Sequence, residues 1–247
     1  MSDSSQKRVA LVTGGAKRVG RAIVETLARD GWNVAFTYFS SEAEADALQE
    51  SYWDEQTNSY RVIRAIADLG ELDTFEKYVR NAVDTFGRLD LLVNSASVYK
   101  PDPPTNDPAF FRHTFEVNIH APLRLAQWFA PLLKSSRGHI VNMIDILAER
   151  PWPAYRTYCA SKAALANLTL SLARELAPEV TVNGIAPGVV EWPPGYPEEE
   201  KQKYLKRVPL QRPGTPQDVA NLVHFLATGG DYITGQIIRL DGGRSIT

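Results

Sequence analysis

Residues 9–20 read Val-Ala-Leu-Val-Thr-Gly-Gly-Ala-Lys-Arg-Val-Gly, a short apolar run that leads directly into a glycine-rich turn. After the turn, apolar residues recur at helical spacing. In such a strand–turn–helix unit, the unpaired N–H groups and the dipole of the helix N-terminus favour an anion. Lys17 and Arg18 add positive charge at the turn. Although Arg18 replaces a glycine of the strict Gly-x-Gly-x-x-Gly pattern, this context predicts a site for the diphosphate of a dinucleotide.

The rest of the chain repeats this alternation of short apolar runs and longer helical patterns. Helical spacing extends over residues 22–29, 74–86 and 162–176. Parallel strands buried on both faces read as continuous apolar runs, and every crossover between them needs a helix. The pattern predicts a single-domain α/β protein with a Rossmann-type, doubly wound, seven-stranded parallel sheet. The seven expected strands comprise residues 9–13, 33–37, 61–65, 89–94, 139–144, 180–185 and 236–240.

No linker, repeat or change of composition divides the chain. We therefore expect a disordered tail of residues 1–7, followed by one dinucleotide-binding catalytic domain of residues 8–247. Residues 187–209 are rich in proline and carry Trp192, Tyr196 and a charged run. In a Rossmann-type sheet the ligand lies beyond the carboxyl ends of the strands. This segment, which follows the sixth strand, is accordingly expected to be a substrate loop that carries a short helix.

The composition argues against several functional classes. The chain has 27 basic and 29 acidic residues, a net charge of −2 that indicates neither nucleic acid nor a membrane surface as a partner. Cys159 is the single cysteine and the four histidines have no ligand spacing, so no metal site is expected. No apolar run reaches the roughly 20 residues that span a bilayer, and the polar start does not resemble a signal peptide. The sequence therefore predicts a cytoplasmic protein.

The end of the second expected strand bears on the choice of coenzyme. Residues 37–41 read Thr-Tyr-Phe-Ser-Ser and contain no acidic residue. An acidic residue there would bind the ribose 2′-hydroxyl of NAD and repel the 2′-phosphate of NADP. Its absence, together with the hydroxyl groups of Ser40 and Ser41, favours NADP(H), with Lys17 or Arg18 as the cation that helps to hold the phosphate.

Tyr158 and Lys162 are four residues apart at the start of a predicted helix, so their side chains lie on one face of it. An unperturbed tyrosine has a pKa of about 10. A nearby ammonium favours the phenolate and lowers this pKa, which would make Tyr158 a usable acid near neutral pH. A Tyr-x-x-x-Lys pair alone is typical of a protein surface. Its place after a strand that ends at Asp145, in a chain with a dinucleotide turn, predicts a nicotinamide-dependent oxidoreductase.

Over essentially its whole length the chain resembles the short-chain dehydrogenase/reductase family. The resemblance rests on several independent motifs that occur in the family's order. They are Thr13-Gly14-x3-Arg18-x-Gly20, Asp68, Asn94-Ser95-Ala96-Ser97, Asn118, Tyr158 with Lys162, Pro187-Gly188, and Tyr232-Ile233-Thr234-Gly235 followed by Asp241-Gly242-Gly243.

The resemblance implies that Tyr158 is the general acid/base, that Lys162 holds the nicotinamide ribose, and that Asn118 supports a proton-relay water. Asp68 would accept a hydrogen bond from the adenine amino group, although an ordinary exposed turn aspartate is an equal alternative. A homotetramer is expected, built through the helix of Tyr158, the helix around Asn118 and the C-terminal strand. The expected cofactor-binding residues are Gly14, Lys17, Arg18, Val19, Tyr38, Ser40, Ser41, Asp68, Leu69, Asn94, Ser95, Ala96, Lys162, Pro187 and Gly188.

Departures from the usual family pattern narrow the substrate. The family usually has a serine shortly after the fifth strand that polarises a carbonyl group, but Asp145 takes that place here. An ionised aspartate does not donate to a carbonyl oxygen, whereas it accepts from an amino group or pairs with a protonated tyrosine. Three segments resemble the pteridine reductase branch of the family. They are Lys17-Arg18, Ala96-Ser97-Val98-Tyr99 and Asn142-Met143-Ile144-Asp145.

By that resemblance Tyr99 would stack a flat pterin against the nicotinamide, and Arg18 and Ser97 would bind the polar edge of the pterin or the diphosphate. Asp145 and Tyr158 would deliver protons as hydride reaches a ring C=N bond. The leading hypothesis is an NADPH-dependent reductase of a small pterin or folate-like substrate. Two alternatives remain: a carbonyl or 3-oxoacyl thioester reductase of the same fold, and a non-catalytic nucleotide sensor, which would have little need of the tyrosine–lysine pair.

Two positions depart from the pteridine reductase branch itself. Ser40 replaces an arginine that the branch often uses for the 2′-phosphate, and Arg244 follows Asp241-Gly242-Gly243 where an aromatic residue is common. The second difference indicates that the far end of the substrate pocket differs from that of the branch.

Overall fold

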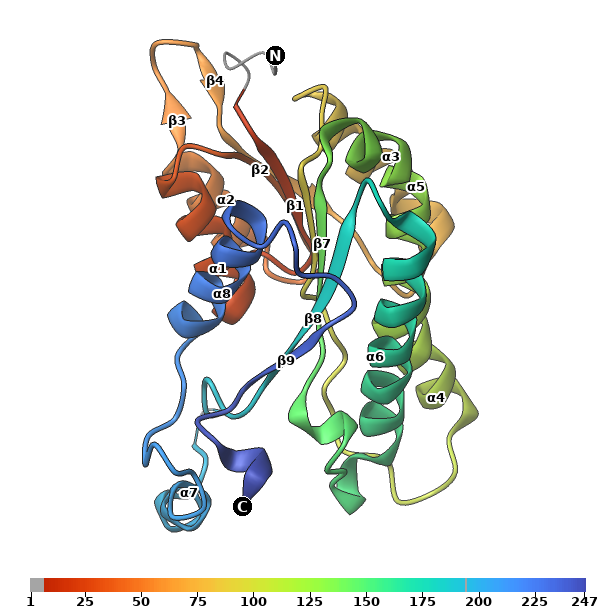
Figure 1. The fold of residues 1–247 in the computed structure, drawn as a ribbon, viewed down its shortest axis with the longest axis vertical. Helices are drawn as coiled ribbons and strands as arrows, with labels where there is room; N and C mark the ends of the chain where they lie inside the picture. The colour runs from red at the N-terminus through yellow and green to blue at the C-terminus, as the bar shows by residue number, and fades with distance from the viewer. Residues whose placement is uncertain (1–6, 194) are drawn as a thin grey trace.

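Seven parallel strands form the central sheet, in the order β5-β2-β1-β6-β7-β8-β9 (Figure 1). The structure is a computed structural model that describes residues 7–193 and 195–247. The predicted doubly wound sheet is confirmed, because β1 lies between β2 and β6 and the chain builds outward on both sides of it. The strands are β1 Val9–Val12, β2 Asn33–Tyr38, β5 Val62–Ile66, β6 Leu91–Asn94, β7 His139–Met143, β8 Thr181–Pro187 and β9 Ile237–Leu240.

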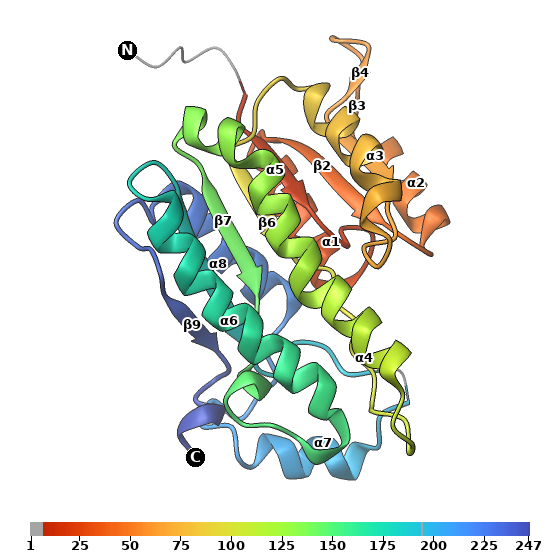
Figure 2. The same cartoon turned by 90° about the vertical axis from the view of Figure 1, so that its right-hand side faces the viewer.

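Helices cover both faces of this sheet. One face carries α1, α2 and α8, and the other carries α3, α5 and α6, of which α5 and α6 run side by side in Figure 2. Each layer has its own apolar core against the sheet. The helices are α1 Arg18–Arg29, α2 Glu42–Glu50, α3 Leu72–Asp84, α4 Pro108–Phe115, α5 Ala121–Ser136, α6 Arg156–Leu176, α7 Glu198–Leu205 and α8 Pro216–Thr228.

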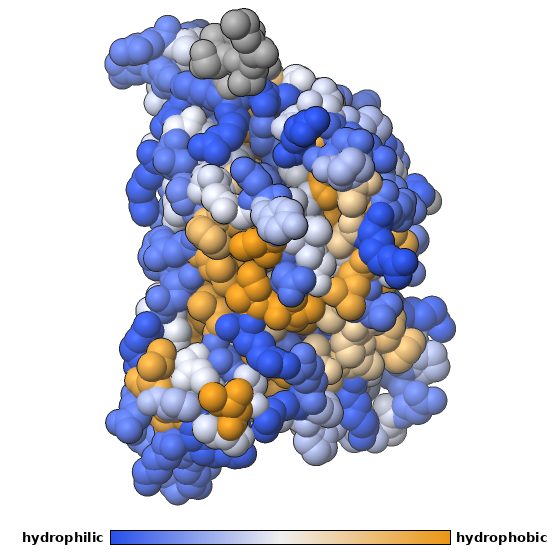
Figure 3. All heavy atoms as spheres, viewed as in Figure 1, coloured by the Kyte–Doolittle hydropathy of each residue, from blue (hydrophilic) through white to orange (hydrophobic). Residues whose placement is uncertain are grey.

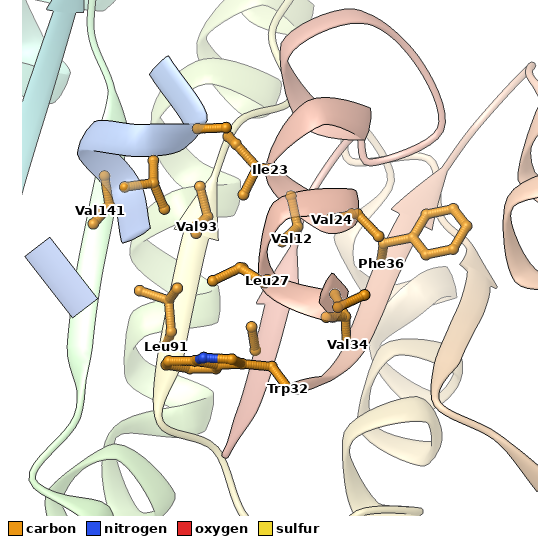
Figure 4. Close-up of a cluster of buried hydrophobic side chains, with 14 of the residues drawn as sticks. Val12, Ile23, Val24, Leu27, Trp32, Val34, Phe36, Leu91, Val93 and Val141 are labelled. Carbon is orange, nitrogen blue, oxygen red and sulfur yellow. The ribbon is translucent and has the colours of Figure 1, made fainter. Parts of the chain in front are cut away.

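The core beneath α1 fixes the glycine-rich turn to the sheet. Ile23, Val24 and Leu27 of α1 are fully buried and point toward strand residues such as Val12 and Val93 (Figure 4). Truncating a leucine in such a core to alanine costs about 2–5 kcal/mol. The strand, the turn and the helix are therefore held as one rigid unit, which positions the N-terminus of α1.

One helix begins earlier than its apolar pattern predicts. The helical spacing starts at residue 162, but α6 begins at Arg156. The Asp102 carboxylate accepts a hydrogen bond from the Thr157 backbone N–H at 3.1 Å and therefore satisfies a donor of the first turn. Because Asp102 lies far from this helix in sequence, the local pattern does not reveal the cap. The earlier start places Tyr158 in the first turn of α6.

Several short elements were not expected from the sequence. An antiparallel hairpin joins β3 Trp53–Asp54 to β4 Ser59–Tyr60, and a π-helical turn, η1, covers Glu116–His120. Short 3₁₀ turns follow at η2 Ile146–Ala148, η3 Pro153–Tyr155 and η4 Arg244–Ile246.

Two further expectations concern the N-terminal segment and the segment after β8. Of the expected tail, residues 1–6 lie outside the described residues. The segment 187–209 carries α7, in agreement with the short helix expected there. Among the described residues, no helix combines the length and apolar character needed to cross a membrane.

Candidate active site

A cavity of about 670 Å³ opens at the carboxyl edge of the sheet, where a Rossmann-type fold binds its ligand. Its walls come from the turn before α1, the segments after β2, β6 and β7, the start of α6, and the loop after β8. Most of the predicted site residues line it. They are Gly14, Lys17, Arg18, Val19, Tyr38, Ser40, Ser41, Ser95, Ala96, Ser97, Tyr99, Asp145, Tyr158, Lys162, Pro187 and Gly188.

The glycine-rich turn brings its backbone close to the floor of the cavity. Gly14 has a φ of +66°, a left-handed conformation that glycine adopts without strain. A Cβ atom on Gly20 would lie 2.1 Å from the Gly14 carbonyl oxygen, so no larger residue fits there. The N-cap residue of α1, Lys17, makes no side-chain cap hydrogen bond. The Lys17 side chain therefore does not occupy the first N–H groups of α1, and the binding of a diphosphate there stays a prediction.

Both cations of the turn are engaged by carboxylates from other segments. Lys17 Nζ lies 2.7 Å from Glu44 Oε1 of α2, and Arg18 Nε donates to Glu191 Oε2 at 2.7 Å. All four side chains are more than a third exposed. Ion pairs of this kind contribute little to stability and yield readily to a stronger partner. An incoming phosphate would compete with Glu44 and Glu191 for the two cations.

The deep end of the cavity holds Asp145, Tyr158 and Lys162 in one connected group. The Tyr158 hydroxyl donates to Asp145 Oδ2 at 2.7 Å, and Asp145 Oδ1 accepts from the Leu147 backbone N–H at 2.8 Å. Lys162 Nζ donates to the Met143 carbonyl oxygen at 2.7 Å and lies 5.7 Å from the centroid of the Tyr158 ring. A protonated Tyr158 that donates to the Asp145 carboxylate is one of the arrangements that the sequence indicates for Asp145.

The electrostatics of this group correct one expectation. The Lys162 ammonium was expected to lower the pKa of Tyr158, but burial and the adjacent Asp145 carboxylate raise that pKa well above its usual value. Burial also raises the pKa of Asp145, although the Leu147 N–H, the Tyr158 hydroxyl and Lys162 oppose this. Burial lowers the pKa of Lys162 to about 8. The phenol is therefore held protonated as a hydrogen-bond donor, with its proton directed at Asp145.

Aromatic side chains form the outer wall of the cavity. Tyr99 and Tyr155 stack with ring centroids 4.8 Å apart and an interplanar angle of 11°, and Tyr99 meets Tyr158 edge to face. Trp192 and Tyr196, from the loop after β8, stack at 5.0 Å. The cavity lining therefore includes two pairs of stacked aromatic rings, of which the Tyr99–Tyr155 pair contacts Tyr158.

Four predicted site residues do not line the cavity. Asn94 is buried and donates to Asn142 Oδ1 at 2.8 Å, between β6 and β7. Asn118 accepts from Ser97 Oγ and the Val98 N–H and donates to Ser161 Oγ at 2.9 Å. Asp68 accepts from the Gly70 N–H, and Leu69 packs in the apolar core. Asn118 thus holds the segment of Ser97 in place, and its expected support of a proton-relay water stays a prediction.

Other lining residues were missed as site residues by the sequence analysis. Trp152, Tyr155, Trp192, Tyr196 and Glu191 all border the cavity. The sequence shows that Trp192 and Tyr196 lie in a proline-rich segment after the sixth strand. It does not show that their rings stack, because that contact depends on the path of the loop. Phe39 also lines the cavity and is 64% exposed. The remaining members are Ala16, Gly20, Met143, Ile144, Val189, Val190 and Pro193.

Comparisons with known proteins agree with this geometry. A family model described as enoyl-(acyl carrier protein) reductase matches residues 14–245. The 3-oxoacyl-(acyl-carrier-protein) reductase FabG of Staphylococcus aureus is 34% identical, over 95% of this chain and 96% of that protein. Pteridine reductase 1 of Leishmania tarentolae is 33% identical, over 100% of this chain and 99% of its own length.

A solved structure extends the similarity to three dimensions. The crystal structure of a blue fluorescent protein from a metagenomic library, in complex with NADPH, superposes with a TM-score of 0.88. It is 32% identical in sequence and the match covers 97% of this chain and 98% of that one. With the parallel sheet, the glycine turn and the paired tyrosine and lysine, these matches establish that the chain belongs to the short-chain dehydrogenase/reductase family of oxidoreductases.

Proposed function

We propose that the protein is an NADPH-dependent reductase of pterins, which reduces a ring C=N bond of a dihydropterin or dihydrofolate. One observation carries the proposal: the Tyr158 hydroxyl donates to Asp145, at 2.7 Å, inside the cavity. A carboxylate at this place suits the amino and ring N–H groups of a pterin, which need acceptors. It suits a simple ketone poorly, because an ionised carboxylate offers no donor to the carbonyl oxygen.

The residues of the cavity fit a nicotinamide dinucleotide. Gly14 and Gly20 carry no side chain, so the backbone of the turn is open to a diphosphate at the N-terminus of α1. Pro187 and Gly188, from the end of β8 and the loop after it, also line the cavity. Ser40, Ser41 and Lys17 would hold the 2′-phosphate of NADP, since no acidic residue ends β2. Tyr38, Val19, Ser95 and Ala96 complete the contact surface. NADPH, when bound, supplies the hydride of the reaction.

The proton is handled by the chain's own side chains. Because the pKa of Tyr158 is raised, its hydroxyl carries a proton that it donates toward the reacting nitrogen. Asp145 accepts the same hydrogen bond before substrate arrives, so it holds the hydroxyl in position and stores a negative charge beside it. The buried Lys162 ammonium is close enough to Asp145 to lower the pKa of that carboxyl group, so it offsets the negative charge. Its Nζ donates to the Met143 carbonyl oxygen.

The aromatic wall would bind the pterin ring. Tyr99, backed by Tyr155, presents a flat face beside Tyr158. Stacking of aromatic rings adds about 0.5–1.5 kcal/mol beyond the area that they bury. Ser97 and Arg18 line the same cavity and would bind the polar edge of the ring. The similarity to pteridine reductase 1 supports this assignment.

A second candidate is a 3-oxoacyl thioester reductase. The similarity to FabG of Staphylococcus aureus, at 34% identity, favours it. Against it stands Asp145, whose carboxylate would have to be protonated before it could donate to the carbonyl oxygen of a thioester substrate. The raised pKa of Asp145 makes such protonation easier than at an exposed aspartate, so the two candidates need a direct comparison.

The comparison uses the purified protein and the oxidation of NADPH, followed by absorbance. Dihydrobiopterin, dihydrofolate and a 3-oxoacyl thioester are offered in turn at equal concentrations, and the same series is repeated with NADH. We expect turnover of the pterins, faster with NADPH than with NADH. Turnover of the thioester alone would refute the pterin reductase and establish the second candidate.

We also propose a homotetramer, as the family resemblance implies. Apolar residues gather around β8 and β9, between α6 and α8, on one face of the molecule (Figure 3). Leu170 of α6 and Phe225 of α8 are 42% and 49% exposed, an arrangement typical of a subunit contact. Light scattering in solution tests this, and a mass equal to one chain would contradict it. The cytoplasmic location expected from the sequence stays a prediction.

A further inference from the structure

A second, smaller cavity of about 80 Å³ adjoins the main one behind Asp145. Tyr99, Asp145 and Trp152 line both cavities, so a molecule held against the catalytic pair reaches the small cavity directly. The far wall consists of Arg150, which follows η2, and of Tyr204 and Arg244. Tyr204 belongs to α7 and Arg244 begins η4, so three segments distant in sequence meet here.

Arg244 is held in place but lacks an anionic partner. Its guanidinium lies over the ring of Tyr204, 5.5 Å from the ring centroid. Its Nε atom is buried and has no hydrogen-bond partner within the described part of the chain. Asp241, the nearby acidic residue, already accepts from the backbone N–H groups of Gly243 and Ser245, at 2.9 Å and 2.6 Å. A buried donor without a partner is costly, so the chain itself does not use the full hydrogen-bonding capacity of Arg244.

Arg150 adds a second positive charge to the same wall. It donates from Nη1 to an oxygen of Thr247, the last residue of the sequence, at 3.1 Å, whereas Arg244 has no Asp or Glu side chain within ion-pair distance among residues 7–193 and 195–247. Because Arg150 is engaged at that oxygen, Arg244 is the guanidinium group of the small cavity with which a ligand oxyanion would pair. The other titratable groups that face it, Tyr99 and Tyr204, are neutral, because burial raises the pKa of each hydroxyl.

We infer that this small cavity is a subsite for a compact oxyanion, a carboxylate or phosphate group, carried by the substrate on a short arm. Arginine matches such groups because its planar fork of N–H donors pairs with two oxygens at once. A volume of about 80 Å³ accommodates one such group. Because the cavity shares Asp145 with the main site, the anion must be attached close to the bond that is reduced. The inference rests on the proposed pterin reductase and adds to it a preference for pterins that carry a short anionic substituent.

The test compares two pterins that differ only in charge at the arm. Pterin-6-carboxylate and neutral 6-hydroxymethylpterin are titrated by calorimetry into the protein saturated with NADP⁺. The wild type should bind the carboxylate more tightly. Arg244→Gln should reduce this preference by at least about tenfold, the usual effect of losing a charge-assisted hydrogen bond. Arg244→Lys, which keeps the charge but loses the planar fork, should retain part of the preference.

Arg174→Gln is the matched control, because Arg174 is exposed on α6 and is not among the residues that line either cavity. It should retain the full preference. Equal binding of the two pterins by the wild type, or an unchanged preference in Arg244→Gln, would overturn the subsite and leave the pterin reductase standing.

A last titration separates failure of the subsite from failure of the proposed function. If the wild type binds neither pterin, the proposed function fails, and inorganic phosphate is titrated into the same NADP⁺-saturated protein. Phosphate binding that is lost in Arg244→Gln would still support the oxyanion subsite. Phosphate binding that is absent, or is the same in both proteins, would overturn it.

Discussion

Charged groups are exposed at one end of the main cavity and buried at the other. By their proposed roles we call the turn before α1 the phosphate end, and the group of Asp145, Tyr158 and Lys162 the catalytic end. At the phosphate end, Lys17 and Arg18 are exposed and share their charges with Glu44 and Glu191. At the catalytic end, Tyr158 and Lys162 are buried, and burial shifts both of their pKa values. We therefore expect coenzyme binding at the first end to depend chiefly on the shape of the backbone, and chemistry at the second end to depend on individual side chains. The difference predicts which substitutions are tolerated at each end.

The largest effect is expected at the catalytic end. Tyr158→Phe removes the proton donor and keeps the ring, so the rate should fall by about 10²–10⁴-fold while the affinity for NADPH changes little. NADPH oxidation gives the rate, and the fluorescence of bound NADPH gives the affinity. Tyr232→Phe is the control, because Tyr232 is fully exposed and is not among the residues that line the cavity. A Tyr158→Phe enzyme with wild-type activity would show that another group donates the proton.

The pH dependence of the rate tests the buried lysine. Because the pKa of Lys162 is lowered to about 8, its ammonium is lost as the pH rises through that value, and kcat/KM should fall. Folding lowers this pKa below its unfolded value of about 10.4, so Lys162 makes the protein more stable, not less, as the pH rises between the two values. Unfolding at this residue therefore does not explain the lost rate.

Lys162→Met serves as the internal control for that profile. Its residual activity should be lower and should lack the decline near pH 8, because the titrating group is gone. Thermal unfolding measured over the same pH range checks that the fold persists. A wild-type rate that stays constant up to a pH of about 10 would contradict the role of the ammonium.

At the phosphate end, the backbone should matter more than the charges. Gly20→Ala forces a Cβ atom against the Gly14 carbonyl oxygen, so the turn must open. The dissociation constant of NADPH should rise by about tenfold or more, with loss of the close approach to the helix N-terminus. Gly229→Ala is the matched control, since a Cβ atom there meets its nearest neighbour at an ordinary 3.5 Å. Equal affinities in the two variants would contradict the account of the turn.

The smallest effect is expected for the exposed cation. Lys17→Gln should weaken NADPH binding by about two- to fivefold and leave NADH binding nearly unchanged, because screened surface charges contribute little. Glu44→Gln frees Lys17 from its ion pair and should strengthen NADPH binding by a similar factor. The two changes, measured by fluorescence titration at low salt, should both shrink at high salt. A large loss of affinity in Lys17→Gln would show that the charge matters more than the backbone.

The same contrast between the two ends separates what the sequence reveals from what it does not. The strands follow from continuous apolar runs, and the turn follows from Gly14 and Gly20 beside a strand, so the sequence predicts the fold and the place of the turn well. These features are local in sequence. The seven strands are found within two residues of their expected ends.

The catalytic end depends on contacts that no local pattern records. The sequence predicts that Lys162 lowers the pKa of Tyr158, and this prediction is wrong. Burial and the contact with Asp145, thirteen residues away, outweigh the effect of Lys162 and raise the pKa. The stacking of Tyr99 on Tyr155 also requires the path of the chain between β7 and α6. The small cavity that Arg244 lines is built from three segments distant in sequence, so the sequence does not predict it. The sequence shows only that Arg244 stands where the pteridine reductase branch commonly has an aromatic residue.

The central claim is that the carboxylate of Asp145 adapts the tyrosine to a pterin. Asp145→Ser restores the residue usual in the family, and a serine still caps η2 in place of the carboxylate that now accepts from Leu147. The decisive measurement is kcat/KM for dihydrobiopterin divided by kcat/KM for a 3-oxoacyl thioester, in the wild type and in Asp145→Ser. We predict that this ratio falls by about 100-fold or more in the variant, because the site loses the partner of the pterin N–H groups. An unchanged ratio would contradict the claim.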